Sequence, residues 1–408
     1  MEQMTTPVYE VNLYLDGVLI GNIREHARSL RWTLSRTRCG VGSIEFSISD
    51  VFFADWCEKR GKTLNEMLRP IAVECRVVRN GVPVAGGYLA TIPTYYPREA
   101  SATLTMKFDD YINLLDGVLL YPAATETKKM GEMIQGWIEM ADARALSHGK
   151  AFGFTAGTID DMPTITQTYD NYQSIKHIIC NRCDNVSGAG PFDMYFHPDK
   201  TYDVIKDENF GDVITDYKIT YPMRLSGVTA SSLSADQVDG FASAVVAVGA
   251  GETSGDGEQD TAITSYQVDE DKVKTYGYYE TLLQDSSVST QSVLDNNAQS
   301  LLETSSSGVW QPKITLLGRF VSPTPVAPEG GYKIWLGDTI TLQNNADRTG
   351  MTTGQFRVNE LFVQVSDSNA ETITPTLARG NVSKPTTFAS EIVKIKDELS
   401  ALKVAKSA

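Results

Sequence analysis

The chain has 408 residues, of which 41% are apolar and 21% charged, so it is long enough for about two to four globular domains and too apolar to be disordered. Its net charge of −15 argues against a surface that grips nucleic-acid phosphates, which needs clustered Lys and Arg. Five cysteines are too few for a disulfide scaffold. No run of about 18 apolar residues predicts a membrane span, and Met1–Asn12 lacks the pattern of a signal peptide, so we expect synthesis in a cytoplasm.

Two hairpins are predicted near the start of the chain. Val8–Leu15 alternates apolar and polar residues and turns at Asp16-Gly17, and a second alternating run turns at Asn80-Gly81. Asp-Gly and Asn-Gly favour tight hairpin turns because both central residues need positive φ. Ser101–Phe108 alternates as well. Several short strands within about 118 residues predict a small β-barrel or sandwich.

Four helices are predicted. Thr63 and Glu66 have capping-box spacing at the start of a short one. The others begin near Met130, run from Tyr172 to Cys183 with Asp170 or Asn171 as cap, and run from Ser289 to Glu303. Their inward residues are expected to be Met130, Ile134, Trp137, Ile138 and Ala141; Tyr172, Ile175, Ile179 and Cys183; and Leu294, Ala298, Leu301 and Leu302.

A second β-rich stretch follows an acidic, Gly-rich loop at residues 249–262. Its predicted strands are Tyr332–Leu336, Thr339–Leu342, Gln355–Val358, Leu361–Val365 and Glu371–Leu377. The fold class is therefore α+β and mostly β, with two β-barrel-like domains, helical and mixed segments between them, and a short C-terminal helix.

The patterns suggest five segments. They are a first β-barrel domain at 1–118; a mixed α/β insertion at 119–212; a mixed central region at 213–306 that holds the loop 249–262 and the helix 289–303; a second β-barrel portion at 307–380, together with 213–230; and a coiled-coil helix at 386–408.

The C-terminal segment carries a coiled-coil pattern. Its apolar residues follow the a/d spacing, and its e and g positions carry opposite charges that would pair in a parallel assembly. The a/d residues are Phe388, Ile392, Ile395, Leu399 and Leu402, the g residues are Glu391 and Glu398, and the e residues are Lys396 and Lys403. Ile at d favours three or more strands over a dimer. The alternative is an amphipathic helix that docks on its own domain.

No catalytic, cofactor or metal site is predicted. His177, Cys180 and Cys183 provide one Cys pair where a structural zinc site needs four ligands, so we expect buried or partly buried thiols. Gly249–Gly255 lacks the Gly-Lys-Ser/Thr ending of a phosphate loop. The adjacent pairs Asp109-Asp110 and Asp160-Asp161 are expected on the surface.

The order of short motifs along the chain resembles the minor tail proteins of siphophages, which form hubs at the tail tip. The motifs that carry the resemblance are Leu15–Gly21, Gly40–Phe46, Arg79–Gly87, Asp109–Leu115, Tyr276–Glu280, Ser289–Leu302, Leu336–Leu342, Phe356–Leu361 and Ile373–Leu377. Each motif is short and degenerate, so the weight lies in their order over nearly the whole chain.

This resemblance implies a structural, non-enzymatic virion protein without a cofactor. It implies a homotrimer at the tail tip that joins the sixfold tail tube or distal tail protein to threefold tip components and frames the DNA exit channel. It also implies contact with the tape measure protein and with tip fibre or receptor-binding components, and with DNA only in transit. An acidic lumen would keep DNA from adhering.

Two other functions compete with this one. The pairs Tyr95-Tyr96 and Tyr278-Tyr279 would suit a module that binds host-surface carbohydrate if their rings were exposed, whereas strand packing would bury them. A cell-wall-degrading enzyme would need two carboxylates that face each other across a cleft, which the sequence does not reveal.

Overall fold

The computed structural model describes residues 6–36, 43–91, 94–96, 103–122, 124–169, 172–183, 192–222, 228–237, 241–249, 262–284, 291–306, 310–318, 321–346 and 352–379. The chain divides into two compact units, a larger unit (Met1–Ser234 and Pro312–Asn381) and a smaller unit (Ala235–Gln311 and Val382–Ala408). The C-terminal segment 386–408 and most of the loop 249–262 lie outside the described residues. No described helix is long and apolar enough to cross a membrane.

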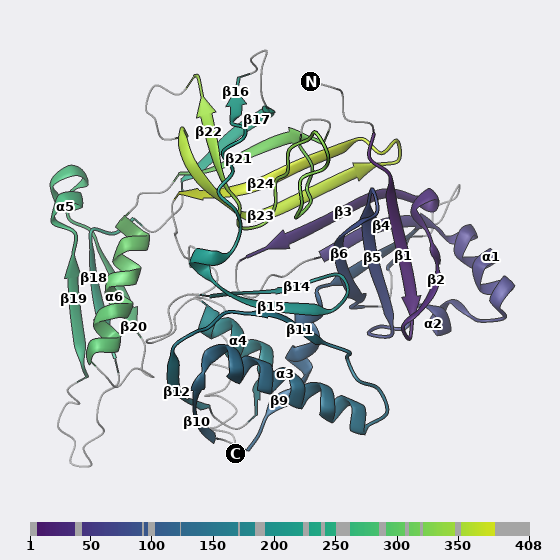
Figure 1. Ribbon diagram of the computed structural model, residues 1–408, viewed down its shortest axis with the longest axis horizontal. Coiled ribbons are helices and arrows are strands. Elements are labelled where there is room, and N and C mark those ends of the chain that lie inside the picture. The colour runs from purple at the N-terminus through teal and green to yellow at the C-terminus, as the bar shows by residue number, and fades with distance from the viewer. Residues whose placement is uncertain are drawn as a thin grey trace. The chain divides into compact units, whose positions relative to one another are not determined.

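The larger unit begins with an antiparallel set of strands, the first β region, in the order β2-β1-β5-β6-β8-β4-β3, with β7 paired to β8 (Figure 1). Its strands are β1 (Tyr9–Leu15), β2 (Val18–Asn22), β3 (Ala27–Ser35), β4 (Ser43–Ser49), β5 (Val73–Arg79), β6 (Val82–Leu89), β7 (Thr94–Tyr96) and β8 (Thr103–Asp109). Asp16-Gly17 and Asn80-Gly81 all have positive φ, which confirms the two predicted turns. Short helical elements join the strands, namely η1 (Arg24–His26), α1 (Asp50–Arg60), α2 (Leu64–Met67) and η2 (Tyr111–Gly117).

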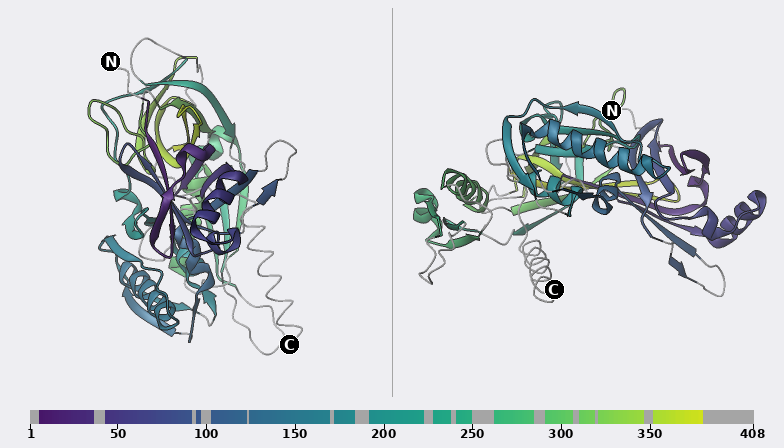
Figure 2. Two further views of the ribbon diagram at one scale, coloured as in Figure 1. Left: turned by 90° about the vertical axis from the view of Figure 1, so that its right-hand side faces the viewer. Right: turned by 90° about the horizontal axis from the view of Figure 1, so that it is seen from below.

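A second set of strands closes on itself. Within the described residues, six strands follow the order β23-β22-β16-β17-β21-β24 and β24 pairs back to β23, so they form a closed barrel with further strands outside it. They are β16 (Ile219–Tyr221), β17 (Val228–Gln237), β21 (Trp310–Leu317), β22 (Thr339–Asn344), β23 (Gly354–Ser366) and β24 (Glu371–Arg379). In the left view of Figure 2 the yellow-green strands curl round a common interior. The mostly β fold class is confirmed.

Strand β23 belongs to both β regions. Its first residues pair with β22, from Gly354↔Leu342 to Arg357↔Thr339, and its later residues pair on the same edge with β3, from Glu360↔Ser35 to Ser366↔Ser29. The change of neighbour falls at the irregularity around Asn359, whose carbonyl accepts a hydrogen bond of 2.8 Å from the Arg36 amide. We call this point the fork.

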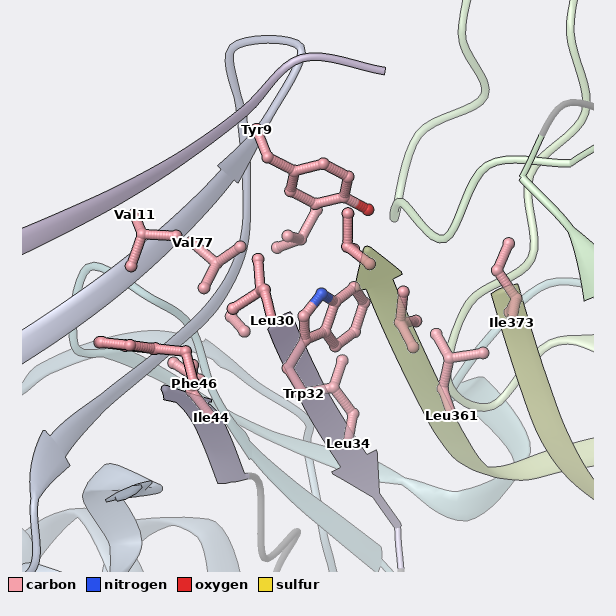
Figure 3. Close-up of a cluster of buried hydrophobic side chains, with 14 of the residues drawn as sticks. Tyr9, Val11, Leu30, Trp32, Leu34, Ile44, Phe46, Val77, Leu361 and Ile373 are labelled. Atoms are coloured by element: carbon pink, nitrogen blue, oxygen red, sulfur yellow. The ribbon is translucent and has the colours of Figure 1, made fainter. Parts of the chain in front are cut away.

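The two β regions also share one hydrophobic core. Trp32 of β3 is 1% exposed and lies between side chains of the first β region, such as Val77, and side chains of the barrel, such as Leu361 and Ile373 (Figure 3). A continuous core and a continuous hydrogen-bonded ladder together make the β regions one folding body.

Residues 119–209 form an inserted segment with its own core. Helix α3 (Met130–Ser147) buries its predicted stripe, and it packs with α4 (Ile175–Cys183) over small sheets. Its strands are β9 (Leu119–Leu120), β10 (Ala124–Lys129), β11 (Thr155–Ile159), β12 (Thr164–Tyr169), β13 (Gln173–Ser174), β14 (Phe192–Phe196) and β15 (Thr201–Lys206), and η3 (Asp207–Asn209) ends it.

The smaller unit is a three-stranded sheet with a helix on one face. Strand β18 (Ala244–Val248) pairs antiparallel with β19 (Thr264–Val268) and parallel with β20 (Glu280–Gln284). Helix α5 (Glu270–Tyr276) connects β19 to β20, and α6 (Gln291–Ser306) packs against the sheet. Leu294, Ala298 and Leu302 are buried as predicted and Leu301 is partly buried, which confirms the helix 289–303.

Three predicted elements need correction. The helix predicted at Tyr172–Cys183 begins at Ile175, because Tyr172 has φ +67° and is 70% exposed while Ser174 Oγ caps the helix by accepting from the His177 amide. Tyr332–Leu336 is not a strand, although Ile334 and Leu336 are buried.

Around Tyr332–Leu336 the backbone groups bind Ser322 and the Asp338 carboxylate instead of a ladder, so alternating burial occurs without a strand. The two predicted strands Gln355–Val358 and Leu361–Val365 form one strand, β23, because the irregularity near Asn359 interrupts the alternation but not the pairing. No pattern had predicted α1.

Candidate functional site at the fork

Charged side chains from three parts of the larger unit meet at the fork. Arg36 follows β3, Asp193 lies on β14, Asp207 lies in η3 and Arg357 lies on β23. The Arg36 guanidinium donates to Asp193 Oδ2 at 2.6 and 3.1 Å and also donates to Asp207, and Arg357 Nη1 lies 3.1 Å from Asp207 Oδ2. Each of the four side chains is at most 10% exposed. Two arginines and two aspartates therefore balance each other in the interior.

Arg357 also binds backbone carbonyls on both sides of the fork. It donates to the carbonyl oxygens of Gly337 at 3.0 Å and Asp207 at 2.6 Å, and to that of Phe210. Burial and the neighbouring Arg36 lower the pKa of Arg357, and the two carboxylates oppose this shift. A planar guanidinium with five donors is suited to hold several acceptors in one geometry.

A second buried contact ties the first β region to the barrel. Arg79 of β5 binds the carboxylate of Glu371 of β24, with Nη2–Oε2 at 2.9 Å, and both side chains are at most 3% exposed. Tyr9 donates its hydroxyl to the same carboxylate, and Arg79 donates to Ser322. Burial and the Glu371 charge raise the pKa of Tyr9 well above its ordinary value, so it remains a donor.

A third contact ties the inserted segment to the first β region. Lys200, in the turn between β14 and β15, lies 2.5 Å from Glu74 of β5 and 3.0 Å from the Phe152 carbonyl oxygen. Pro198 in the same turn packs so closely on Gly86 that a Cβ there would overlap it. These three contacts hold the first β region, the inserted segment and the barrel in fixed relative positions.

The residues that the sequence singled out have structural partners where they are described. Asp110 is not on the surface as expected, because it is 5% exposed and caps η2 by accepting from the Ile112 amide. Asp160 accepts from the Lys206 amide, and Asp161 pairs with Lys129. Among the described residues, no group of three or more His, Cys, Asp or Glu side chains could hold a metal ion.

The tyrosine pairs and the coiled-coil residues have different outcomes. Tyr278 and Tyr279 are 51% and 57% exposed, so strand packing does not bury them. Tyr95 and Tyr96 lie on β7, with side chains outside the described residues. The a/d, g and e residues between Phe388 and Lys403 are outside them as well.

Sequence reasoning missed the four charged residues of the fork. Their partners are far apart along the chain, with 171 positions between Arg36 and Asp207 and 150 between Asp207 and Arg357. The local signal was a charge inside an apolar run, as in Phe192-Asp193-Met194 and Phe356-Arg357-Val358. Such a residue on a buried strand needs a partner of opposite charge, but the run does not identify it.

Comparisons with known proteins rest on structure. No family model matches the chain, and no curated protein matches its sequence. The 43 kDa tail protein of prophage MuSo2 from Shewanella oneidensis is 12% identical with a TM-score of 0.61, over 92% of this chain and 100% of that one. A tail protein from Neisseria meningitidis is 13% identical with a TM-score of 0.58, over 92% and 98%.

A third solved structure agrees with these two. The prophage tail protein gp18 from Listeria monocytogenes is 11% identical with a TM-score of 0.56, over 96% of this chain and 98% of that one. At such identities the likeness is one of fold, and it covers at least 92% of this chain in all three comparisons. The chain therefore has, over nearly its whole length, the fold of phage tail proteins.

Proposed function

We propose that this protein is a structural hub at the tip of a phage tail and that three copies form a ring. The observation that carries the proposal is the union of two β regions by one strand, β23, and one core, because a ring that presents two β regions per subunit needs them rigidly spaced. The fold shared with solved phage tail proteins supports a structural role in the tail. In the ring, the protein joins the sixfold tail tube or distal tail protein to threefold tip components.

The segment 386–408 supplies the proposed trimer contact. Its g residues Glu391 and Glu398 face the e residues Lys396 and Lys403 of the next helix in a parallel arrangement. A seam of about two heptads is too short to be stable alone, so the trimer also needs contacts between β regions. The proposed trimer therefore depends on the segment 386–408 and on contacts between β regions, and one experiment can separate these two contributions.

The test measures the mass of the assembly in solution for four chains. The full chain is expected to be a trimer, and a chain that ends at residue 385 is expected to dissociate more readily. Lys396→Glu with Lys403→Glu places like charges at every e/g contact and should weaken the trimer, and adding Glu391→Lys with Glu398→Lys should restore it. A full chain that is monomeric, or a charge swap without effect and without rescue, contradicts the role of this segment.

The other partners follow from the position in the tail. We propose contact with the tape measure protein and with tip fibre or receptor-binding components, and passage of DNA through the ring. Each chain carries a net charge of −15, so a ring of three chains is strongly acidic and DNA should pass without adhering. The surface potential of the lumen in an imaged tail tip tests this point, and a strongly basic channel would overturn it.

A further inference from the structure

The connection between β19 and β20 in the smaller unit exposes an unusual number of aromatic rings. It runs through α5, a helix without a buried residue, and it carries Tyr276, Tyr278 and Tyr279, each more than half exposed. Tyr266 of β19 is 54% exposed beside them. We call Tyr266, Tyr276, Tyr278 and Tyr279 the tyrosine platform. Aromatic side chains that do not build a core are available to bind something else.

The backbone beneath the platform is held firmly by one buried residue. Ser243 is 0% exposed, and its hydroxyl accepts from the Tyr279 amide at 2.8 Å and donates to the Gly277 carbonyl at 3.0 Å. The Ser243 and Ala244 amides both donate to the Tyr279 carbonyl at 2.9 Å, and the Ser243 carbonyl accepts from the Asp269 amide at 2.9 Å. Both ends of the connection are therefore fixed to the start of β18.

The rings are held in two groups, one formed by Tyr266 and Tyr278 and the other by Tyr276 and Tyr279 around Phe241. The hydroxyls of Tyr266 and Tyr278 lie 2.6 Å apart, and Tyr278 donates to the Glu280 carboxylate. Phe241 meets the Tyr276 ring at 5.4 Å and the Tyr279 ring at 5.8 Å, both edge to face. A set of rings ordered before binding loses little conformational entropy when a ligand arrives.

We propose that the tyrosine platform binds a neutral saccharide. A phenol ring offers an apolar face to the C–H face of a sugar and a hydroxyl to its polar edge. The Glu280 carboxylate can accept hydrogen bonds from sugar hydroxyls, and it disfavours an acidic sugar or a nucleic acid by charge repulsion. All residues of this site belong to the smaller unit, so the saccharide proposal can be tested independently of the proposed ring.

A protein partner fits the same surface less well. In the register of the sheet, Val246 lies between Tyr266 and Leu282 on the face that is turned away from α6. Leu282 is 60% exposed and Val246 is half-buried. Together with Phe241, which packs against two of the rings, these two residues supply apolar surface beside the rings, and a stable protein interface typically has a larger desolvated apolar centre.

The test applies the full chain to an array of immobilised neutral and acidic oligosaccharides. We expect retention on one or more neutral members and none on acidic ones. Tyr279→Ala and Tyr278→Ala should each weaken binding about tenfold through the loss of a stacking ring. Tyr278→Phe keeps the ring and should weaken it less. The control is Tyr172→Asn, which removes an even more exposed tyrosine of the larger unit where φ is +67°, a conformation that asparagine adopts readily.

Other outcomes overturn the proposal. A folded chain that binds no member of the array does so, as does binding that survives both alanine substitutions. Unchanged melting temperatures of the variants show that a loss of binding is not a loss of fold. If the alanine variants instead change the mass of the assembly while the array stays empty, the platform is a protein contact and the saccharide site is wrong.

Discussion

At the scale of single residues, the fork depends on charges that cancel in the interior. Asp207 binds both Arg36 and Arg357, so it is the carboxylate that joins the inserted segment to the first β region and to the barrel at once. A buried charge left without its partner costs far more than an exposed one, because water cannot replace the lost interaction.

Asp207→Asn should therefore destabilise the protein by about 3–5 kcal/mol, as is typical when one partner of a buried pair is removed. Urea unfolding at neutral pH measures this loss. The same substitution at Asp161, whose pair with Lys129 is exposed, should leave the unfolding midpoint unchanged. Equal effects at the two positions would show that the fork is not held by its charges.

A pH dependence is expected at Asp203 of β15. Burial alone would raise its pKa, but hydrogen bonds from His197 at 2.7 Å and from the Thr158 amide at 2.7 Å outweigh burial and hold the pKa below the ordinary 3.8. The folded state thus favours the ionised form, and the resulting stability is present above pH 3.8 and is lost as the pH falls through the depressed pKa.

Asp203→Asn should consequently lower the urea midpoint at pH 7, and the difference from the unsubstituted chain should shrink as the pH falls below about 4. Midpoints measured from pH 7 to pH 3 give the comparison. A difference that does not change with pH would mean that the side chain acts through its shape and not through its charge.

At the scale of elements, two glycines allow the inserted segment to meet the barrel. Gly211 follows η3 and Gly337 precedes β22, and both have φ of +85°. A Cβ on Gly211 would overlap the Gly337 carbonyl, and a Cβ on Gly337 would overlap the Phe210 ring. Both conformation and space therefore require glycine at this junction.

Gly211→Ala should cost at least about 2 kcal/mol, from backbone strain and overlap together. Gly17→Ala is the matched comparison, because φ there is +82° but no atom lies within 4 Å of the added Cβ, so it should cost about 1 kcal/mol. Denaturant midpoints of the two variants separate the cost of backbone strain, which both share, from the cost of steric overlap, which only Gly211→Ala has. Similar losses would mean that the junction can shift to make room.

Elements defined by local rules could be predicted from the sequence. Asp16-Gly17 and Asn80-Gly81 specify their turns through positive φ, and the stripe from Met130 to Ala141 specifies α3 through its spacing. The failures have a common cause. Alternating burial at Tyr332–Leu336 was mistaken for a strand because a pattern shows which side chains are inside but not which groups satisfy the backbone.

The fork could not be predicted either, because a burial pattern does not show which strand or which charge a buried residue pairs with. The alternation of Leu361–Val365 shows a strand with one buried face, but β3, more than 300 positions away, competes with every other strand as its neighbour. Likewise, Arg36 and Arg357 are buried charges that need a partner, but the residues around them do not indicate that Asp207 is that partner. Partner choice depends on the whole chain, so local patterns in the sequence do not specify it.

At the scale of the whole molecule, the two units differ in the number of apolar side chains that they bury. The larger unit shares one continuous core between its β regions. Among the described residues, the buried apolar cluster between the sheet and α6 of the smaller unit consists of Val245, Ala247, Leu294, Ala298 and Leu302. Because local stability follows buried apolar contact, the smaller unit should open more readily.

Hydrogen exchange followed by mass spectrometry checks this. Amides of β23 and β24 should exchange only when the larger unit unfolds as a whole, whereas amides of β18 and α6 should exchange earlier and independently. Equal protection in both units would show that they unfold together, which would contradict the division of the core.

The pairing of β23 with β3 also determines how the larger unit resists mechanical force. Its seven pairs with β3 lie side by side along one direction, from Glu360↔Ser35 to Ser366↔Ser29. A tension applied along that direction loads all seven pairs in shear, so they must rupture together, whereas a force across the strands would peel them one at a time. The joint between the first β region and the barrel is therefore expected to resist tension along β23 much better than tension across it.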